Sequence, residues 1–104
     1  MRVFIDDIKD PPPEGSFNEV CRDIDSAIKL VQSGKVSFIS FDHDLGQGEG
    51  RDAIEVAKEI EKLAQEHKIS PIYYEIHSGN SVGKANIDAA MQSAWRFWKE
   101  DIHR

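Results

Sequence analysis

Three short apolar runs, each ending in polar side chains, constrain the fold of this chain most. They span residues 3–5, 36–41 and 72–76, and their β-branched and aromatic residues are typical of buried strands. A segment with the apolar spacing of a helix lies before the second run, another follows the second run, and a third follows the third run. Strands that alternate with helices pair in parallel through right-handed crossovers. We therefore predict one α/β domain, a layered and mostly parallel sheet with helices on both faces.

Each predicted helix has apolar residues on one face and polar residues on the other. The first has Asp23 or Asp25 available as its N-cap and Gly34 as its stop. The prolines at positions 11–13 predict a stiff surface loop, because they remove amide donors and favour extended backbone. A brief edge strand is predicted within residues 17–22. The predicted helices span residues 24–33, 51–67 and 82–98.

The composition is that of a soluble globular domain. The chain has 104 residues, of which 39% are hydrophobic and 31% are charged. It contains no apolar run long enough to span a membrane and no signal-peptide core at its start, so a cytoplasmic location is expected. The net charge of −6 argues against a broad nucleic-acid-binding face. The single cysteine, Cys21, is predicted to be a packed thiol.

Polar residues follow all three predicted strands. At one strand end they could equally be a solvated turn, since Asp and Gly are common in turns. The carboxyl ends of parallel strands meet at one edge of the sheet, however, and ligands bind at that edge in open α/β sheets. Three polar strand ends therefore favour a shared site. The residues are Asp6 and Asp7, then Asp42, His43 and Asp44, then His77 and Ser78.

The residue types at these strand ends suit phosphate chemistry with a hard metal ion. Carboxylates at Asp6, Asp7 and Asp42 match the oxygen ligands that Mg²⁺ and Mn²⁺ prefer. Zinc would need His43 and His77 as direct ligands, and the sequence has no structural zinc spacing. Imidazole titrates near neutral pH, so both histidines are candidates for proton transfer to or from a phosphate ester.

Residues 79–85 look superficially like a phosphate loop. The stretch is one residue short between its glycines and has Ala85 where a magnesium-binding hydroxyl is needed, which excludes a nucleoside triphosphatase. Free amides between Gly79 and Gly83 could still hold an anion at the start of the last helix, although a simple helix cap is the alternative. Ser78 is interpreted as a phosphate-binding hydroxyl, because nothing near it marks a Ser-His-Asp arrangement.

Two resemblances follow from these residues. The acid pair after the first strand, Asp42 with Gly50 eight residues later, and the hydroxyl of Ser78 resemble the receiver domain of response regulators. A narrower match covers almost the whole chain. Residues 6–11 (DDIKDP), 42–46 (DHDLG) and 77–83 (HSGNSVG) resemble the three signature blocks of the cyclic-phosphate processing receiver domain. That family usually has Arg where Lys9 stands, which offers a bidentate grip that Lys lacks, and Pro where Ser81 stands.

This resemblance implies a reduced, flavodoxin-like receiver fold and a magnesium-dependent, or manganese-dependent, phosphoesterase. Its implied partner is a nucleotide or RNA end that bears a cyclic phosphate, with no membrane involved. Two other functions are compatible with the same residues: a non-enzymatic receiver phosphorylated on Asp42, and a module that binds a phosphate end without cleaving it. The implied metal ligands are Asp6, Asp7, Asp42 and Asp44; the implied catalytic residues are His43, His77 and Asp42; the implied phosphate contacts are Lys9, Ser78, Asn80 and Gly83.

Overall fold

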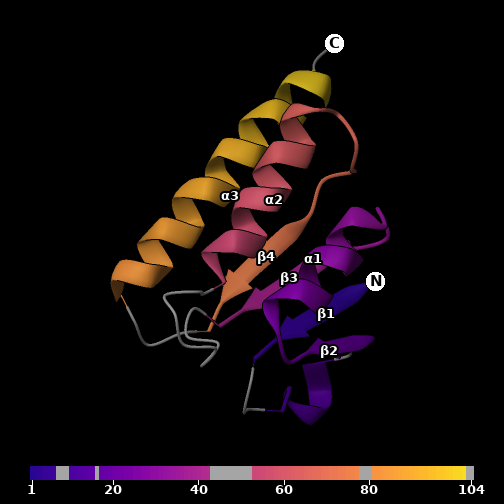
Figure 1. The fold of residues 1–104 in the computed structure, drawn as a ribbon, viewed down its shortest axis with the longest axis vertical. Helices are drawn as coiled ribbons and strands as arrows, with labels where there is room; N and C mark the ends of the chain where they lie inside the picture. The colour runs from indigo at the N-terminus through magenta and orange to yellow at the C-terminus, as the bar shows by residue number, and fades with distance from the viewer. Residues whose placement is uncertain (7–9, 16, 43–52, 78–80, 103–104) are drawn as a thin grey trace.

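The computed structural model describes residues 1–6, 10–15, 17–42, 53–77 and 81–102. Within these residues the chain forms a four-stranded, all-parallel sheet and three α-helices (Figure 1). This confirms the predicted α/β class and receiver-like architecture. The elements are β1 (Arg2–Ile5), the 3-10 helix η1 (Pro13–Gly15), β2 (Glu19–Cys21), α1 (Ile24–Gln32), β3 (Phe38–Phe41), α2 (Ile54–Gln65), β4 (Tyr73–Ile76) and α3 (Ser81–Ile102).

The strand order is β2-β1-β3-β4. The chain leaves β1 in one direction to form β2 and then crosses to the other side of β1 to form β3. The boundary between β1 and β3 is therefore the topological switch point, where open α/β sheets bind their ligands.

All three helices lie on the same face of the sheet, so the prediction of helices on both faces is wrong. The crossovers from β2 to β3 and from β3 to β4 run in the same direction, and a right-handed connection places both on one face. Accordingly α1 contacts α2, and α2 contacts α3 (Figure 1). The connection from β1 to β2 runs the other way and belongs to the opposite face; its described residues, which include the prolines at positions 11–13, form the short turn η1 and no α-helix.

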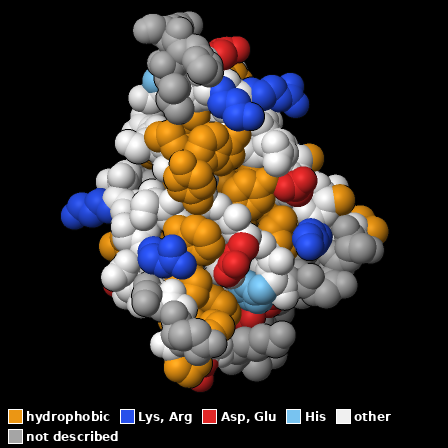
Figure 2. Space-filling view, turned by 180° about the vertical axis from the view of Figure 1, so that it is seen from behind, with side chains coloured by type: hydrophobic (Ala, Val, Ile, Leu, Met, Phe, Trp, Pro, Cys, Tyr) orange, Lys and Arg blue, Asp and Glu red, His pale blue; other side chains and the backbone are white. Residues whose placement is uncertain are grey.

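An aromatic cluster covers part of the face without helices. The ring of Phe17 contacts Phe4 edge-on at a centroid distance of 5.3 Å, and the guanidinium of Arg2 lies 4.2 Å from the ring centroid of Phe38. A Cβ atom at Gly15 would lie 2.8 Å from the Phe17 ring, so a glycine there lets the ring reach the sheet. Figure 2 views the molecule from behind, where hydrophobic side chains gather among charged ones.

The main core lies between the sheet and the helices. Its α3 stripe, Ile87, Ala90, Met91, Ala94 and Trp98, is buried as predicted, and so is the thiol of Cys21. Two indoles anchor α3 to the segment before β4, where Trp95 Nε1 donates to the Ile72 carbonyl at 3.1 Å and Trp98 Nε1 donates to the Ile69 carbonyl at 3.3 Å.

Local signals set the ends of the first helix. Asp23 is the N-cap and accepts a 2.7 Å hydrogen bond from the Ser26 amide, and Gly34 follows the helix with a φ of 76°. Elsewhere the boundaries differ by a few residues: β3 begins at Phe38 rather than at position 36, and α3 continues to Ile102. None of the described helices is long and apolar enough to cross a membrane.

Candidate functional site

The hydrogen bonding of the sheet continues one residue past β1, β3 and β4. The amide of Asp6 donates to the Cys21 carbonyl at 3.1 Å. The amide of Asp42 donates to the Ile5 carbonyl at 3.0 Å, and the amide of His77 donates to the Phe41 carbonyl at 2.8 Å. Because Ile5 pairs with Phe41 in register, Asp6 and Asp42 follow as neighbours, and His77 follows next to Asp42. Side chains alternate between the faces of a sheet. Asp6, Asp42 and His77 therefore form a row on the face opposite to that of the helix-facing residues that precede them.

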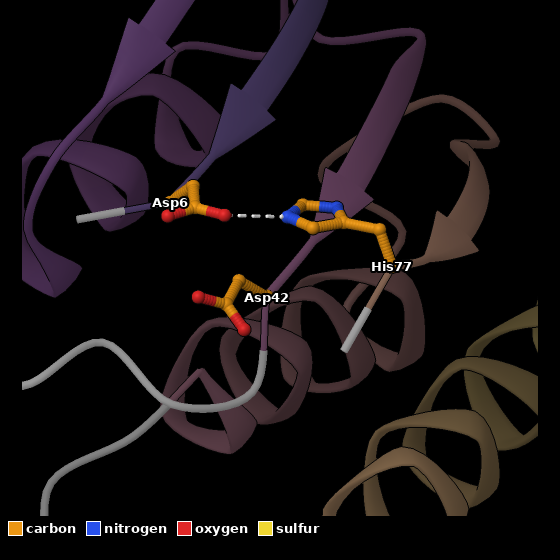
Figure 3. Close-up of side chains that lie close together, drawn as sticks. All are labelled: Asp6, Asp42 and His77. Atoms are coloured by element: carbon orange, nitrogen blue, oxygen red, sulfur yellow. Dashed lines mark hydrogen bonds and ion pairs between the residues drawn. The ribbon is translucent and has the colours of Figure 1, made fainter. Parts of the chain in front are cut away.

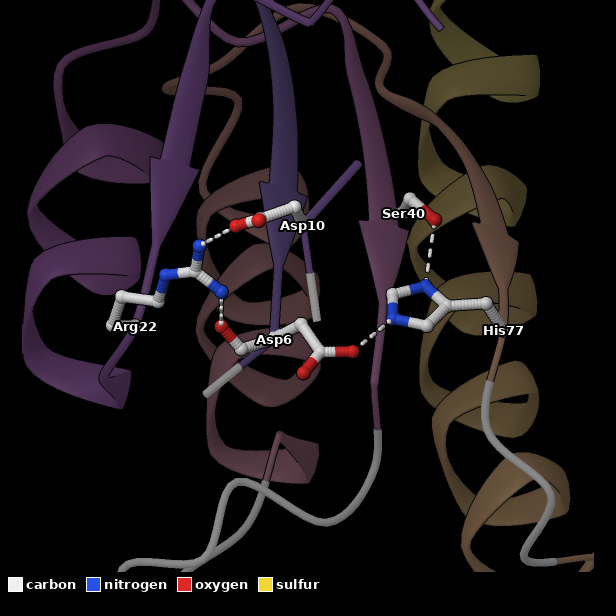
Figure 4. A network of polar contacts seen from close by, with 5 residues as sticks. All are labelled: Asp6, Asp10, Arg22, Ser40 and His77. Atoms are coloured by element: carbon white, nitrogen blue, oxygen red, sulfur yellow. Dashed lines mark hydrogen bonds and ion pairs between the residues drawn. The ribbon is translucent and has the colours of Figure 1, made fainter. Parts of the chain in front are cut away.

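His77 reaches across β3 to contact β1 (Figure 4). Its Nε2 atom lies 3.0 Å from Asp6 Oδ2, and its Nδ1 atom lies 2.8 Å from Ser40 Oγ. The imidazole is stacked on the Phe4 ring, with the two planes 5° apart and the centroids 4.6 Å apart. Ser40 is fully buried. We conclude that the small side chain at position 40 leaves room for the imidazole to cross β3.

The roles of the two ring nitrogens of His77 depend on which of them carries the proton. An ionised Asp6 carboxylate only accepts hydrogen bonds, so a neutral imidazole beside it would carry its proton on Nε2. Nδ1 then accepts from the Ser40 hydroxyl. If the ring gains a second proton, the same hydroxyl can accept from Nδ1 instead. Ser40 therefore provides a partner for either protonation state of His77.

Asp6, Asp42 and His77 can together offer ligand atoms to a cation. One atom from each lies within 4.8 Å of the others (Figure 3). Two carboxylates match Mg²⁺ or Mn²⁺, which bind few protein oxygens and complete their shells with water and phosphate. Asp6 is only 2% exposed, and a buried carboxylate requires partners such as His77. The donor set therefore fits the predicted ion.

Arg22 lies at the β2 end of the same row (Figure 4). Its NH1 atom donates to the Asp6 carbonyl at 3.1 Å, and its NH2 atom lies 2.5 Å from Asp10 Oδ1. Neither Arg22 nor Ser40 is among the predicted site residues. The available signals were a hydroxyl inside an apolar strand at position 40 and a cation at the end of a predicted strand at position 22.

The structure brings three of the predicted site residues together: Asp6, Asp42 and His77. Gly83 is buried in the first turn of α3, and its phosphate contact stays a prediction. The metal and catalytic roles stay predictions too. The remaining predicted residues lie outside the described ones; they are Asp7, Lys9, His43, Asp44, Ser78 and Asn80.

Two surface cavities lie elsewhere on the described part of the chain. One of about 430 Å³ lies between α2 and α3 and is lined by Lys58 and Ala90 among others. One of about 290 Å³ lies beside Tyr73 and Trp95. Neither is lined by the residues of the row, so neither adds a residue to the site.

Comparisons with curated proteins and with solved structures found no match. A family model described as the cyclic-phosphate processing receiver domain matches residues 1–93, a range that includes Asp6, Asp42 and His77. The match confirms the resemblance drawn from the three sequence blocks: the chain belongs to the cyclic-phosphate processing receiver domain family.

Proposed function

We propose that this domain binds a cyclic phosphate ester, such as a 2′,3′-cyclic phosphate at an RNA end, and opens its ring by metal-dependent hydrolysis. The description of the family supports a link to cyclic-phosphate processing. The observation that carries the proposal is the meeting of Asp6, Asp42 and His77 at the switch point, with His77 Nε2 3.0 Å from the buried Asp6 carboxylate.

Asp6 and Asp42 are the residues that would hold the metal ion. Bound Mg²⁺ or Mn²⁺ would neutralise charge on the phosphate and polarise its oxygens. Asp42 extends from β3 and Asp6 from β1, so the strand register sets the distance between the two carboxylates. The 3.0 Å contact between His77 Nε2 and Asp6 Oδ2 orients the carboxylate, as partners of metal-binding carboxylates commonly do, until the reacting oxygen takes its place at Nε2.

Ring opening also requires a proton to move. A bond forms between phosphorus and a water oxygen, the bond from phosphorus to one ribose oxygen breaks, and a proton from the water ends on that ribose oxygen. His77 with Asp6 is the described pair suited to this transfer. Both ring nitrogens of His77 have partners in the structure, so the reacting oxygen must replace the Asp6 carboxylate at Nε2. Ser40 keeps its contact with Nδ1 in either protonation state.

The test is incubation of the purified protein with RNA that bears a 2′,3′-cyclic phosphate, in Mg²⁺, in Mn²⁺ and in chelator. We expect metal-dependent ring opening that falls by about 100-fold or more in His77→Ala, the usual contribution of an acid–base group. Asp42→Asn, which removes a metal-binding carboxylate, should lower it to a similar extent. Glu75→Gln is the matched control, because Glu75 is an exposed carboxylate on β4, two residues before His77. It should keep full activity.

Other results would assign another function to the same residues. Turnover that is unchanged by chelator and equally fast in both variants would contradict the proposal. Binding of the cyclic phosphate without turnover would identify a binding module. Stable phosphorylation of Asp42 by a small phosphoryl donor, without ring opening, would identify a signalling receiver.

A further inference from the structure

A phosphate at this edge of the sheet would lie next to two carboxylates, and it therefore needs positive charge nearby. Among the described residues, Arg22 brings a cation to the row. Ile5 pairs with Cys21 in register, so Arg22 follows β2 next to Asp6, just as Asp42 follows β3 on the other side of Asp6. The backbones of Arg22 and Asp6 are thus separated by one strand spacing, about 4.8 Å.

The two ends of the Arg22 fork have different surroundings. NH1 donates to the backbone carbonyl of Asp6, a partly buried contact at the end of the sheet. NH2 contacts the carboxylate of Asp10, whose side chain is 87% exposed, whereas that of Arg22 is 41% exposed. One end of the guanidinium is therefore anchored in the sheet, and the other binds an anionic oxygen that is open to solvent.

From this geometry we infer that Arg22 binds the phosphate of the substrate and that the Asp10 carboxylate occupies the position of that phosphate in the ligand-free protein. A guanidinium recognises carboxylate and phosphate oxygens with the same planar geometry. An exposed ion pair is weak, because water solvates both partners well, so a phosphate with more acceptor oxygens can displace Asp10. The anchor on the Asp6 carbonyl keeps Arg22 in place during the exchange. The inference rests on the proposed function, since it assigns a further residue to the same site.

The inference predicts effects of opposite sign for the two partners of the pair. Removing the Asp10 charge removes a competitor, so Asp10→Asn should bind phosphate about 2- to 5-fold more tightly, the range of an exposed ion pair. Removing the guanidinium removes a charged hydrogen bond, so Arg22→Gln should bind phosphate about 10-fold or more weakly. The phosphate affinity of Arg22→Lys should lie between those of the unchanged protein and Arg22→Gln, because lysine keeps the charge and loses the fork. A pair that served only the fold would give both variants the same sign.

The experiment is calorimetric titration of the protein with inorganic phosphate, with and without Mg²⁺. Glu66→Gln is the matched control, because it removes a carboxylate from another exposed pair, with Lys68 at 3.6 Å, after the end of α2. Its phosphate affinity should equal that of the unchanged protein. With cyclic-phosphate RNA as substrate, KM should follow the same order as the phosphate dissociation constants, with little change in kcat. Thermal denaturation of each variant verifies that it is folded.

Weaker binding in both Asp10→Asn and Arg22→Gln would overturn the inference, and so would unchanged binding in both or absence of phosphate binding by the unchanged protein. If the Arg22 variants do not fold, Asp10→Asn alone decides, since Asp10 is exposed. Opposite effects on phosphate binding without any ring opening would support the role of Arg22 while the proposed reaction fails, so the two failures can be distinguished.

Discussion

Replacing Ser40 with alanine removes the hydroxyl that contacts Nδ1 of His77 and leaves the rest of the side chain in place. Ser40 is fully buried beneath the imidazole, so water cannot simply take the position of the hydroxyl. His77 would keep its contacts with Asp6 and with the Phe4 ring. The change therefore tests one hydrogen bond of the site in isolation.

The expected loss of stability follows from that hydrogen bond. A buried polar atom that loses its partner costs about 1–3 kcal/mol. The His77 side chain is 21% exposed, so water reaches part of the ring, and we expect about 1–2 kcal/mol, in the lower half of that range. For a domain of this size the loss corresponds to a fall in Tm of roughly 4–12 °C.

The assay is urea denaturation, with ¹⁵N NMR of the imidazole as a second measurement. Ser37→Ala is the control, since its hydroxyl donates to the Met1 carbonyl at 3.1 Å in an exposed position and should cost less than about 0.5 kcal/mol. The unchanged protein should show the proton on Nε2 of His77. The reasoning is refuted if Ser40→Ala is as stable as Ser37→Ala, or if the neutral ring carries its proton on Nδ1.

Three further predictions concern residues outside the site. Burial, with the charges of Glu19 and Asp23, raises the pKa of the Cys21 thiol from 9.0 to about 11. The contribution of this thiol to stability is therefore complete below pH 9 and lost as the pH rises through 11. Over this range the urea midpoint of Cys21→Ala should fall less than that of the unchanged protein, and equal falls in the two proteins would contradict the prediction. Burial and a hydrogen bond to Asp88 raise the pKa of Tyr74 to about 12, so Asp88→Asn should lower it in a spectroscopic titration, with Tyr74→Phe identifying the signal. Gly15→Ala should cost about 1–3 kcal/mol by displacing the Phe17 ring, and unchanged ring shifts of Phe4 would contradict it.

The strands and helices follow from local patterns that the sequence displays directly. Apolar runs at residues 3–5 and 72–76 predict β1 and β4 because β-branched and aromatic side chains suit a buried strand. Asp23 and Gly34 bracket α1 because one caps free amides and the other adopts a positive φ. The distribution of the helices was not predictable in the same way, because it depends on the order of the strands and the hand of each crossover.

The site divides in the same manner. The sequence by itself determined that Asp6, Asp42 and His77 end their strands, and parallel strands bring such ends to one edge. Only the tertiary structure decided that His77 bonds Asp6, 71 residues away along the chain, and Ser40, 37 residues away, and that Arg22 joins the row. The physical reason is that these contacts depend on strand order, on register and on a small residue at position 40, whereas the residue patterns report only on each strand's own burial.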